Sequence, residues 1–165
     1  MPDKTLTIEQ ILTMLRATPS RIAALTADLT SAQLRAAPTP GEWSANEVLA
    51  HLRACADVWG GCIAVILAED VPTIRAMDPR TWMAHTDYPA QEFAPSLDAF
   101  TAQRAALLAV LEPLPPDRWS RSANVTGAGK PLVRTVQTYG AWLAIHERPH
   151  VKQIQRIAAT LAVNG

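Results

Sequence analysis

The sequence predicts an all-α fold, a four-helix bundle with long connecting loops and at least one crossover along the bundle. Four segments carry apolar residues at alternating steps of three and four, the period of one helical face. No segment shows the strict alternation of a half-buried strand. The connections of roughly fifteen to twenty-five residues are too long for tight helical hairpins, which predicts the crossover. The length of 165 residues is typical of one domain, spanning residues 1–165.

The first predicted helix covers residues 8–29, where Ile8, Ile11, Leu15, Ile22 and Leu29 share one face. Pro19 falls inside it, removes a backbone donor and crowds the carbonyl four residues earlier. The helix therefore either kinks at this proline or restarts with Thr18 as its cap. We favour the kink.

The second predicted helix opens after Ser44, which forms a capping box with Glu47 three residues later. Its apolar stripe runs from Val48 to Ile66. The two cysteines of the chain, Cys55 and Cys62, lie on it seven residues apart. This spacing separates their Cα atoms by about 10 Å, too far for a disulfide, so we expect reduced, buried thiols.

Residues 69–95 are irregular and longer than most loops in compact domains, which indicates function or mobility, with room for a short helix. The third predicted helix spans residues 97–111 and stops at the prolines of EPLPPDRW. A second long connection with glycines and Pro131 follows. The fourth helix spans residues 136–161, and His146 and His150 lie in its apolar stripe.

Charge and hydropathy exclude two classes of partner. Fifteen Lys and Arg balance fifteen Asp and Glu without clustering, so the basic surface that nucleic acids require is absent. Apolar runs are far shorter than the roughly 20 residues of a membrane span. The polar, amphipathic start is unlike a signal peptide, so we expect a cytoplasmic protein.

The segment HERPH places two histidines four apart, on one helical face, where both can bind one metal. A zinc-peptidase reading fails because residues 151–165 contain no Asp, Glu, His or Cys to supply the downstream ligand. The remaining histidines are His51, on the flank of the second helix, and His85, in the long loop. His51 is the better third ligand, because a second helix facing the fourth would direct it into the bundle.

Two motifs carry a resemblance to a known family. The segment GEWSANEVLAHLRACADVW resembles the second-helix signature of DinB-like proteins, and HERPHVKQIQRI resembles their final helix. The resemblance covers nearly the whole chain in helix order and spacing. It implies a four-helix bundle that forms a homodimer and binds a divalent metal, zinc or nickel, through His51, His146 and His150. Characterised relatives include thiol-dependent enzymes such as mycothiol-dependent maleylpyruvate isomerase and bacillithiol transferases.

Pro149 lies between the two histidines of the fourth helix and removes a hydrogen bond to the carbonyl of Ile145. The resulting bend either swings His150 away from the site or helps to aim it. The sequence leaves both alternatives open.

Two side chains are weak candidates for a catalytic role. Glu147 lies about 100° around the helix from His146, so it does not share the apolar stripe. It either acts as a base on bound water or pairs with Arg148 or Lys130 at the surface. We favour the surface. His85, with Trp82 and Tyr88, either lines the mouth of a substrate pocket or belongs to an ordinary loop clamp.

Three further residues lie one helical turn from the predicted ligands. Cys55 follows His51 and either approaches the metal or packs in the core; we favour the core, because free cysteine commonly packs as a small apolar side chain. Gln153 follows His150 and either orients a ligand by hydrogen bonding or lies on the rim of the bundle. Trp142 precedes His146 and is a candidate wall of the site.

These residues support one main functional hypothesis and two alternatives. The main hypothesis is an enzyme that activates a thiol or water at a divalent metal for transfer to a small electrophilic substrate, with a low-molecular-weight thiol as a further cofactor. The first alternative is a non-catalytic, stress-associated metal-binding module. The second is a metal-free helical scaffold that dimerises through apolar faces.

Overall fold

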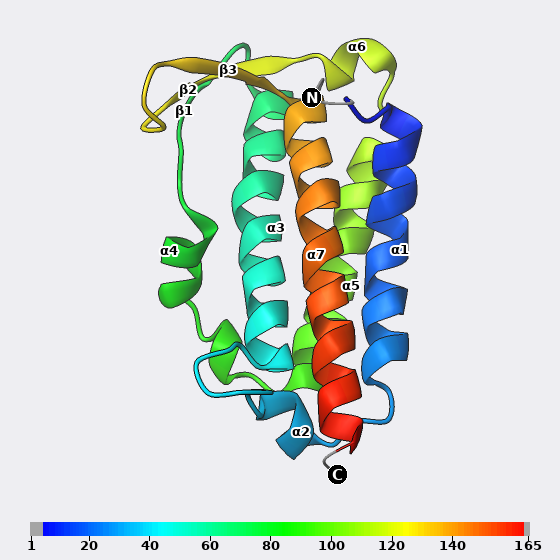
Figure 1. Ribbon diagram of the computed structural model, residues 1–165. Coiled ribbons are helices and arrows are strands. Elements are labelled where there is room, and N and C mark those ends of the chain that lie inside the picture. Colours follow the sequence, from blue (N-terminus) through cyan, green and yellow to red (C-terminus); the bar gives the residue numbers. More distant parts are fainter. Residues whose placement is uncertain (1–4, 164–165) are drawn as a thin grey trace.

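The computed structural model describes residues 5–163 and has four long helices packed as a bundle. These helices are α1 (Ile8–Thr26), α3 (Ala45–Ala68), α5 (Phe93–Leu111) and α7 (Val136–Val163). In Figure 1, α1 and α7 run in one direction and α3 and α5 run in the other. Both α1 and α3 contact α5 and α7. The predicted four-helix bundle is confirmed.

The crossover that loop length predicted is the connection between α3 and α5. It leaves the end of α3 and descends along the outside of that helix to the opposite end of the bundle, where α5 begins (Figure 1). It carries strand β1 (Thr73–Arg75), helix α4 (Pro79–Ala84) and the short 3₁₀ helix η1 (Tyr88–Ala90). Both α4 and η1 pack against α3.

A small sheet at one end of the bundle corrects the expectation of a fold without strands. Strand β2 (Ser122–Thr126) pairs in parallel with β1 and antiparallel with β3 (Leu132–Thr135). The connection from α5 to this sheet passes through helix α6 (Pro116–Trp119). The strands are three, five and four residues long, too short to show the alternation by which strands are recognised in a sequence.

The helix boundaries follow local signals. The predicted capping box of α3 is present, since Ser44 Oγ accepts from the amide of Glu47, whose side chain accepts from the amide of Ser44. Helix α1 continues through Pro19 instead of restarting at Thr18. It ends at Thr26, three residues earlier than predicted, and the short helix α2 (Ser31–Arg35) follows.

The interior consists of two apolar clusters with a polar layer between them. One cluster contains Leu15, Cys55 and Ala144, and the other contains Ile22, Leu52 and Val151. The polar layer is formed by the buried side chains of three helices, Thr18 of α1, Arg104 of α5 and Glu147 of α7.

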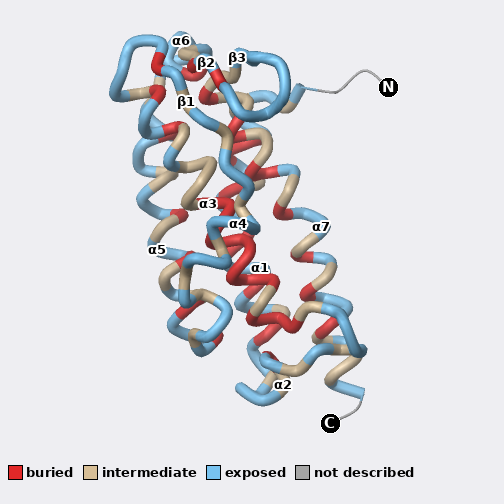
Figure 2. Tube along the Cα trace, turned by 90° about the vertical axis from the view of Figure 1, so that its left-hand side faces the viewer, coloured by how far each residue is buried: buried red, intermediate tan, exposed pale blue. Residues whose placement is uncertain are grey.

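Helix α3 is buried on every side over residues 48–56 (Figure 2). The bundle covers its inner face, and the crossover covers part of its outer face, where Arg53 lies 3.7 Å from the ring centroid of Tyr88. By length and hydropathy alone α3 could cross a membrane, but 56% of its most apolar window is buried within the protein. Its apolar character is therefore that of a central core helix.

Candidate metal centre

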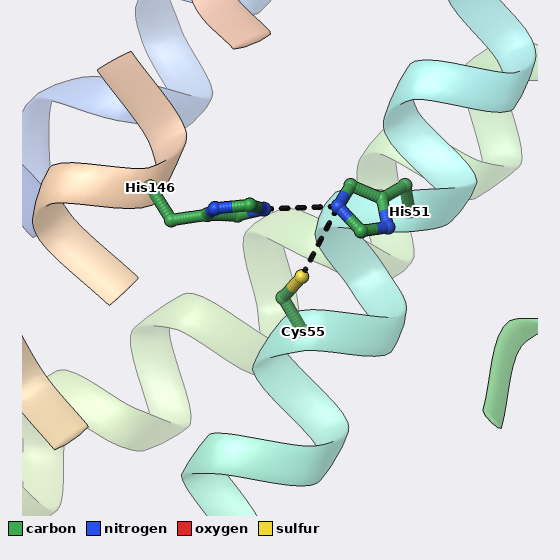
Figure 3. A group of neighbouring side chains, drawn as sticks. All are labelled: His51, Cys55 and His146. Carbon is green, nitrogen blue, oxygen red and sulfur yellow. Dashed lines mark hydrogen bonds between the residues drawn. The ribbon is translucent and has the colours of Figure 1, made fainter. Parts of the chain in front are cut away.

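Three imidazoles from two helices meet on the inner side of α3 and α7. Nε2 of His146 lies 2.9 Å from Nε2 of His51 and 3.2 Å from Nε2 of His150. The ring centroids of His51 and His150 are 4.9 Å apart. Figure 3 shows His51 and His146 pointing toward one another from their separate helices. The structure thus brings together the three histidines that the sequence singled out.

The proline between His146 and His150 does not separate them. Helix α7 continues through Pro149 as one element, and the two Nε2 atoms remain in contact. Of the two alternatives left open by the sequence, the one in which a bend removes His150 is excluded.

Burial favours neutral rings at this point. It lowers the pKa of His51 to about 4, with further lowering by the neighbouring His150 and His146. Burial also lowers the pKa of His146, again helped by His150. A neutral imidazole offers one nitrogen lone pair to a metal, so these environments favour the protonation state that coordination needs.

The outer nitrogen of His150 has a defined partner. Its Nδ1 lies 2.9 Å from Oε1 of Gln153, an amide oxygen that can only accept a hydrogen bond. The Nδ1 therefore carries the proton and the lone pair is left on Nε2, the nitrogen that faces His146. Hydrogen bonds of this kind orient metal-binding histidines. Of the two roles considered for Gln153, orientation of a ligand is the one that the geometry supports.

Cys55 is a core residue, as favoured from the sequence, and it also lies beside the histidines. Its side chain is 1% exposed, and its Sγ is 3.6 Å from Nε2 of His51. The ligand atoms of His51, Cys55 and His146 all lie within 4.8 Å of one another (Figure 3). Burial raises the pKa of the Cys55 thiol to about 12, so the protein without a bound cation keeps it protonated.

The separations between the nitrogens suit a small divalent cation. Two imidazoles bound to zinc at about 2.0 to 2.1 Å, with near-tetrahedral angles, place their nitrogens about 3.3 Å apart. The observed separations are 2.9 and 3.2 Å. Without a cation, Nε2 of His146 faces two ring nitrogens and can donate a proton to only one of them, whereas a cation accepts a lone pair from each ring. The residues present therefore fit a metal ion bound by nitrogen.

Aromatic side chains surround the histidines. Trp43 packs on His51 with ring centroids 5.2 Å apart, and Trp59 packs edge-on against His146 at 5.2 Å. Trp142 meets Trp59 at 5.7 Å. Trp43 and Trp59 were not singled out beforehand, because a tryptophan in or beside an apolar stripe is equally expected in an ordinary core.

A cleft of about 700 Å³ opens beside His146. Trp142 and Trp59 both line it, which agrees with the prediction that Trp142 forms a wall of the site. The remaining lining residues are Thr5, Leu6, Thr135, Gln137, Thr138, Ala141 and Ile145. None of these residues is an Asp, a Glu, a Lys or an Arg. The volume of the cleft is typical of a site for a small molecule.

Glu147 is not on the surface, as favoured from the sequence, but inside the bundle. It is 2% exposed and forms an ion pair with Arg104, which is equally buried. Its Oε2 also accepts a hydrogen bond of 2.8 Å from Thr18 Oγ1. These contacts occupy the carboxylate, and neither Arg148 nor Lys130 is its partner.

The long loop is held by Asp57 of α3. Its Oδ2 accepts hydrogen bonds from Trp82 Nε1 at 2.9 Å and from the Tyr88 hydroxyl at 2.6 Å. His85 is exposed, directs Nδ1 to the carbonyl of Thr81 and is not among the residues that line the cleft. The loop-clamp interpretation therefore describes this segment better than a pocket mouth does.

Comparisons with known proteins bear on the fold and the family of this chain. A search of curated proteins gave no match. Among solved structures, YfiT from Bacillus subtilis superposes with a TM-score of 0.81 over 98% of this chain and 93% of its own, at 18% identity. That protein is described as a probable metal-dependent hydrolase with an unusual four-helix bundle topology. At this level of identity the likeness shows the shared fold.

The family assignment comes from the sequence itself. The family model of the DinB superfamily matches residues 14–154, a range that contains all three histidines of the centre, the whole of α3 and residues 136–154 of α7. The chain belongs to the DinB superfamily.

Proposed function

We propose that the protein is a divalent-metal-dependent enzyme in which His51, His146 and His150 hold the metal. The observation that carries this proposal is the convergence of their Nε2 atoms, at 2.9 and 3.2 Å from that of His146. Imidazole ligands favour zinc or nickel among the available divalent ions. A metal bound by neutral ligands lowers the pKa of a coordinated water or thiol and supplies a nucleophile near neutral pH.

The residues around the centre prepare it for this role. Burial keeps His51 and His146 neutral, and Gln153 fixes the proton of His150 on the nitrogen that faces away from the other rings. Trp59 covers one edge of His146 and limits access of bulk water. These groups would bind the metal and orient its ligands.

The cleft beside His146 is where we place the substrate. Its lining of aromatic, aliphatic, hydroxyl and amide groups suits a small uncharged molecule with an apolar part that packs on Trp59 and Trp142. The reacting carbon would then lie next to His146. The substrate class is a small electrophile such as an ester, an amide or an activated ring.

Water is the first candidate for the nucleophile, because the structurally similar YfiT is described as a probable metal-dependent hydrolase. A low-molecular-weight thiol is the second, which makes the protein a thiol-dependent transferase or isomerase. The observation that favours it is the cleft volume of about 700 Å³, enough for a thiol cofactor beside a small electrophile.

The experiment uses the full chain purified without a histidine tag. Elemental analysis is expected to find one zinc or nickel ion per chain after loading. The loaded protein is then incubated with uncharged aromatic esters, amides and epoxides, with and without low-molecular-weight thiols. Turnover above that of the free metal supports the proposal, and its dependence on thiol identifies the nucleophile.

His51→Ala and His150→Ala are the test variants, and His85→Ala is the matched control because His85 lies outside the centre. Loss of metal and turnover in the first two only is the expected result. Stoichiometric metal with no turnover across the panel would favour the non-catalytic metal-binding module. Absence of metal in the wild-type protein would favour the metal-free scaffold.

The homodimer remains a prediction from the resemblance. Sedimentation equilibrium of the loaded protein tests it: a mass of twice 17.9 kDa is expected.

A further inference from the structure

The thiol of Cys55 offers a further ligand atom beside His51 and His146. It follows His51 by one turn of α3, so both side chains leave the helix on the same face. Figure 3 shows its sulfur pointing toward His51 Nε2, which in turn faces His146. No described hydrogen bond other than this 3.6 Å contact occupies the sulfur.

The separation of the sulfur from His51 matches that of two ligands bound to one ion. A zinc ion with a sulfur ligand at about 2.3 Å and a nitrogen ligand at about 2.0 to 2.1 Å separates the two atoms by about 3.6 Å at tetrahedral angles. The separation of Cys55 Sγ from His51 Nε2 is 3.6 Å.

We propose that Cys55 is a thiolate ligand of the metal, so that the centre has three nitrogens and one sulfur. This inference rests on the proposed metal site and extends its ligand set. On binding, the sulfur–hydrogen bond of Cys55 breaks, the sulfur keeps the electron pair to form the bond to the metal, and the proton passes to solvent. Nothing is oxidised or reduced.

A thiolate ligand has consequences for the metal that the site accepts. Soft thiolate donors favour zinc, cobalt and nickel over magnesium and manganese, which prefer oxygen ligands. The negative sulfur also offsets part of the metal's charge, which the three imidazoles alone leave uncompensated. With four protein ligands, a water or thiol substrate would enter as a fifth ligand, a coordination number that catalytic zinc sites reach in the transition state.

The test is cobalt substitution of the full chain, followed by absorption spectroscopy. A thiolate bound to Co²⁺ gives an intense charge-transfer band in the near ultraviolet, whereas a centre with only imidazole ligands does not. The wild-type protein is expected to show the band at one equivalent of cobalt, and Cys55→Ala is expected to lose it. Cys62→Ser is the matched control, because Cys62 is the other cysteine of α3 and should leave the band unchanged.

Two outcomes overturn the inference, and they differ in what they imply for the function. A wild-type protein that binds one cobalt without the band has a nitrogen-only centre, which leaves the proposed function standing. A protein that binds no cobalt lacks the centre, and both proposals fail. X-ray absorption of the zinc-loaded wild-type protein gives an answer even where Cys55→Ala does not fold: a sulfur neighbour at about 2.3 Å is expected, and its absence refutes the ligand role.

Discussion

Glu147, which directly follows His146 in the sequence, is paired with Arg104 inside the bundle. The pair joins α7 to α5, and Arg104 also donates to the carbonyl of Leu15 in α1 at 2.9 Å. It separates the two apolar clusters of the core. A charged pair at this depth fixes how α7 is rotated within the bundle, and thereby which way His146 points.

Breaking the pair should strongly destabilise the fold. Glu147→Leu leaves the Arg104 guanidinium buried without a counter-charge, and Arg104→Met leaves the carboxylate in the same state. We expect each single variant to lose about 3 to 5 kcal/mol of unfolding free energy. The measurement is urea denaturation of metal-free protein.

The double variant Arg104→Met with Glu147→Leu is the control, because it removes both charges together. Its unfolding free energy should be closer to wild type than that of either single variant. If the two losses simply added, the pair would not be the cause.

The sequence was sufficient to predict the bundle, because the four long helices carry apolar stripes that repeat with the helical period. Helix α2 and the sheet were not predictable in this way. Their elements are five residues or shorter, and the pairing of β1 with β2 joins segments about fifty residues apart in the chain. Such pairing depends on the tertiary fold and leaves little local pattern.

The site was predictable where ligands share one helical face, as His146 and His150 do. Glu147 was misplaced because the stripe analysis assumes one buried face per helix, whereas α7 is packed by α1 on one side and by α3 on the other. Cys55 lies in the apolar core, as predicted, and its place one turn after His51 on α3 also brings its sulfur to that ring.

Gln153 should contribute to metal affinity without touching the metal. Replacing it by leucine removes the acceptor that holds the Nδ1 proton of His150. We expect Gln153→Leu to weaken zinc binding about 10- to 100-fold, measured by competition with a chromophoric chelator. Gln155→Leu is the matched control, because Gln155 is an exposed glutamine two residues later in the same helix. Equal affinities for the two variants would exclude the orienting role.

Asp57 should control the order of the crossover. Asp57→Ala removes the acceptor of Trp82, Tyr88 and Gln103, and hydrogen bonds to a charged group contribute about 1.5 to 3 kcal/mol each. We expect faster amide hydrogen exchange across residues 78–91, with the bundle helices unchanged. Asp98→Ala, at an exposed position of α5, should leave exchange as in wild type. Unchanged protection in Asp57→Ala would mean that apolar contacts alone hold the loop.

Metal removal should lower the melting temperature, because the ligands are assembled only when α3 and α7 pack together. A ligand that binds only the folded state stabilises it by about 2.7 kcal/mol at a free concentration of 100 times Kd. We therefore expect zinc to raise Tm by several degrees and a chelator to reverse the rise. In His150→Ala the rise should be largely lost, whereas His85→Ala should retain it. A rise of equal size in both variants would place the stabilising zinc outside the centre formed by His51, His146 and His150.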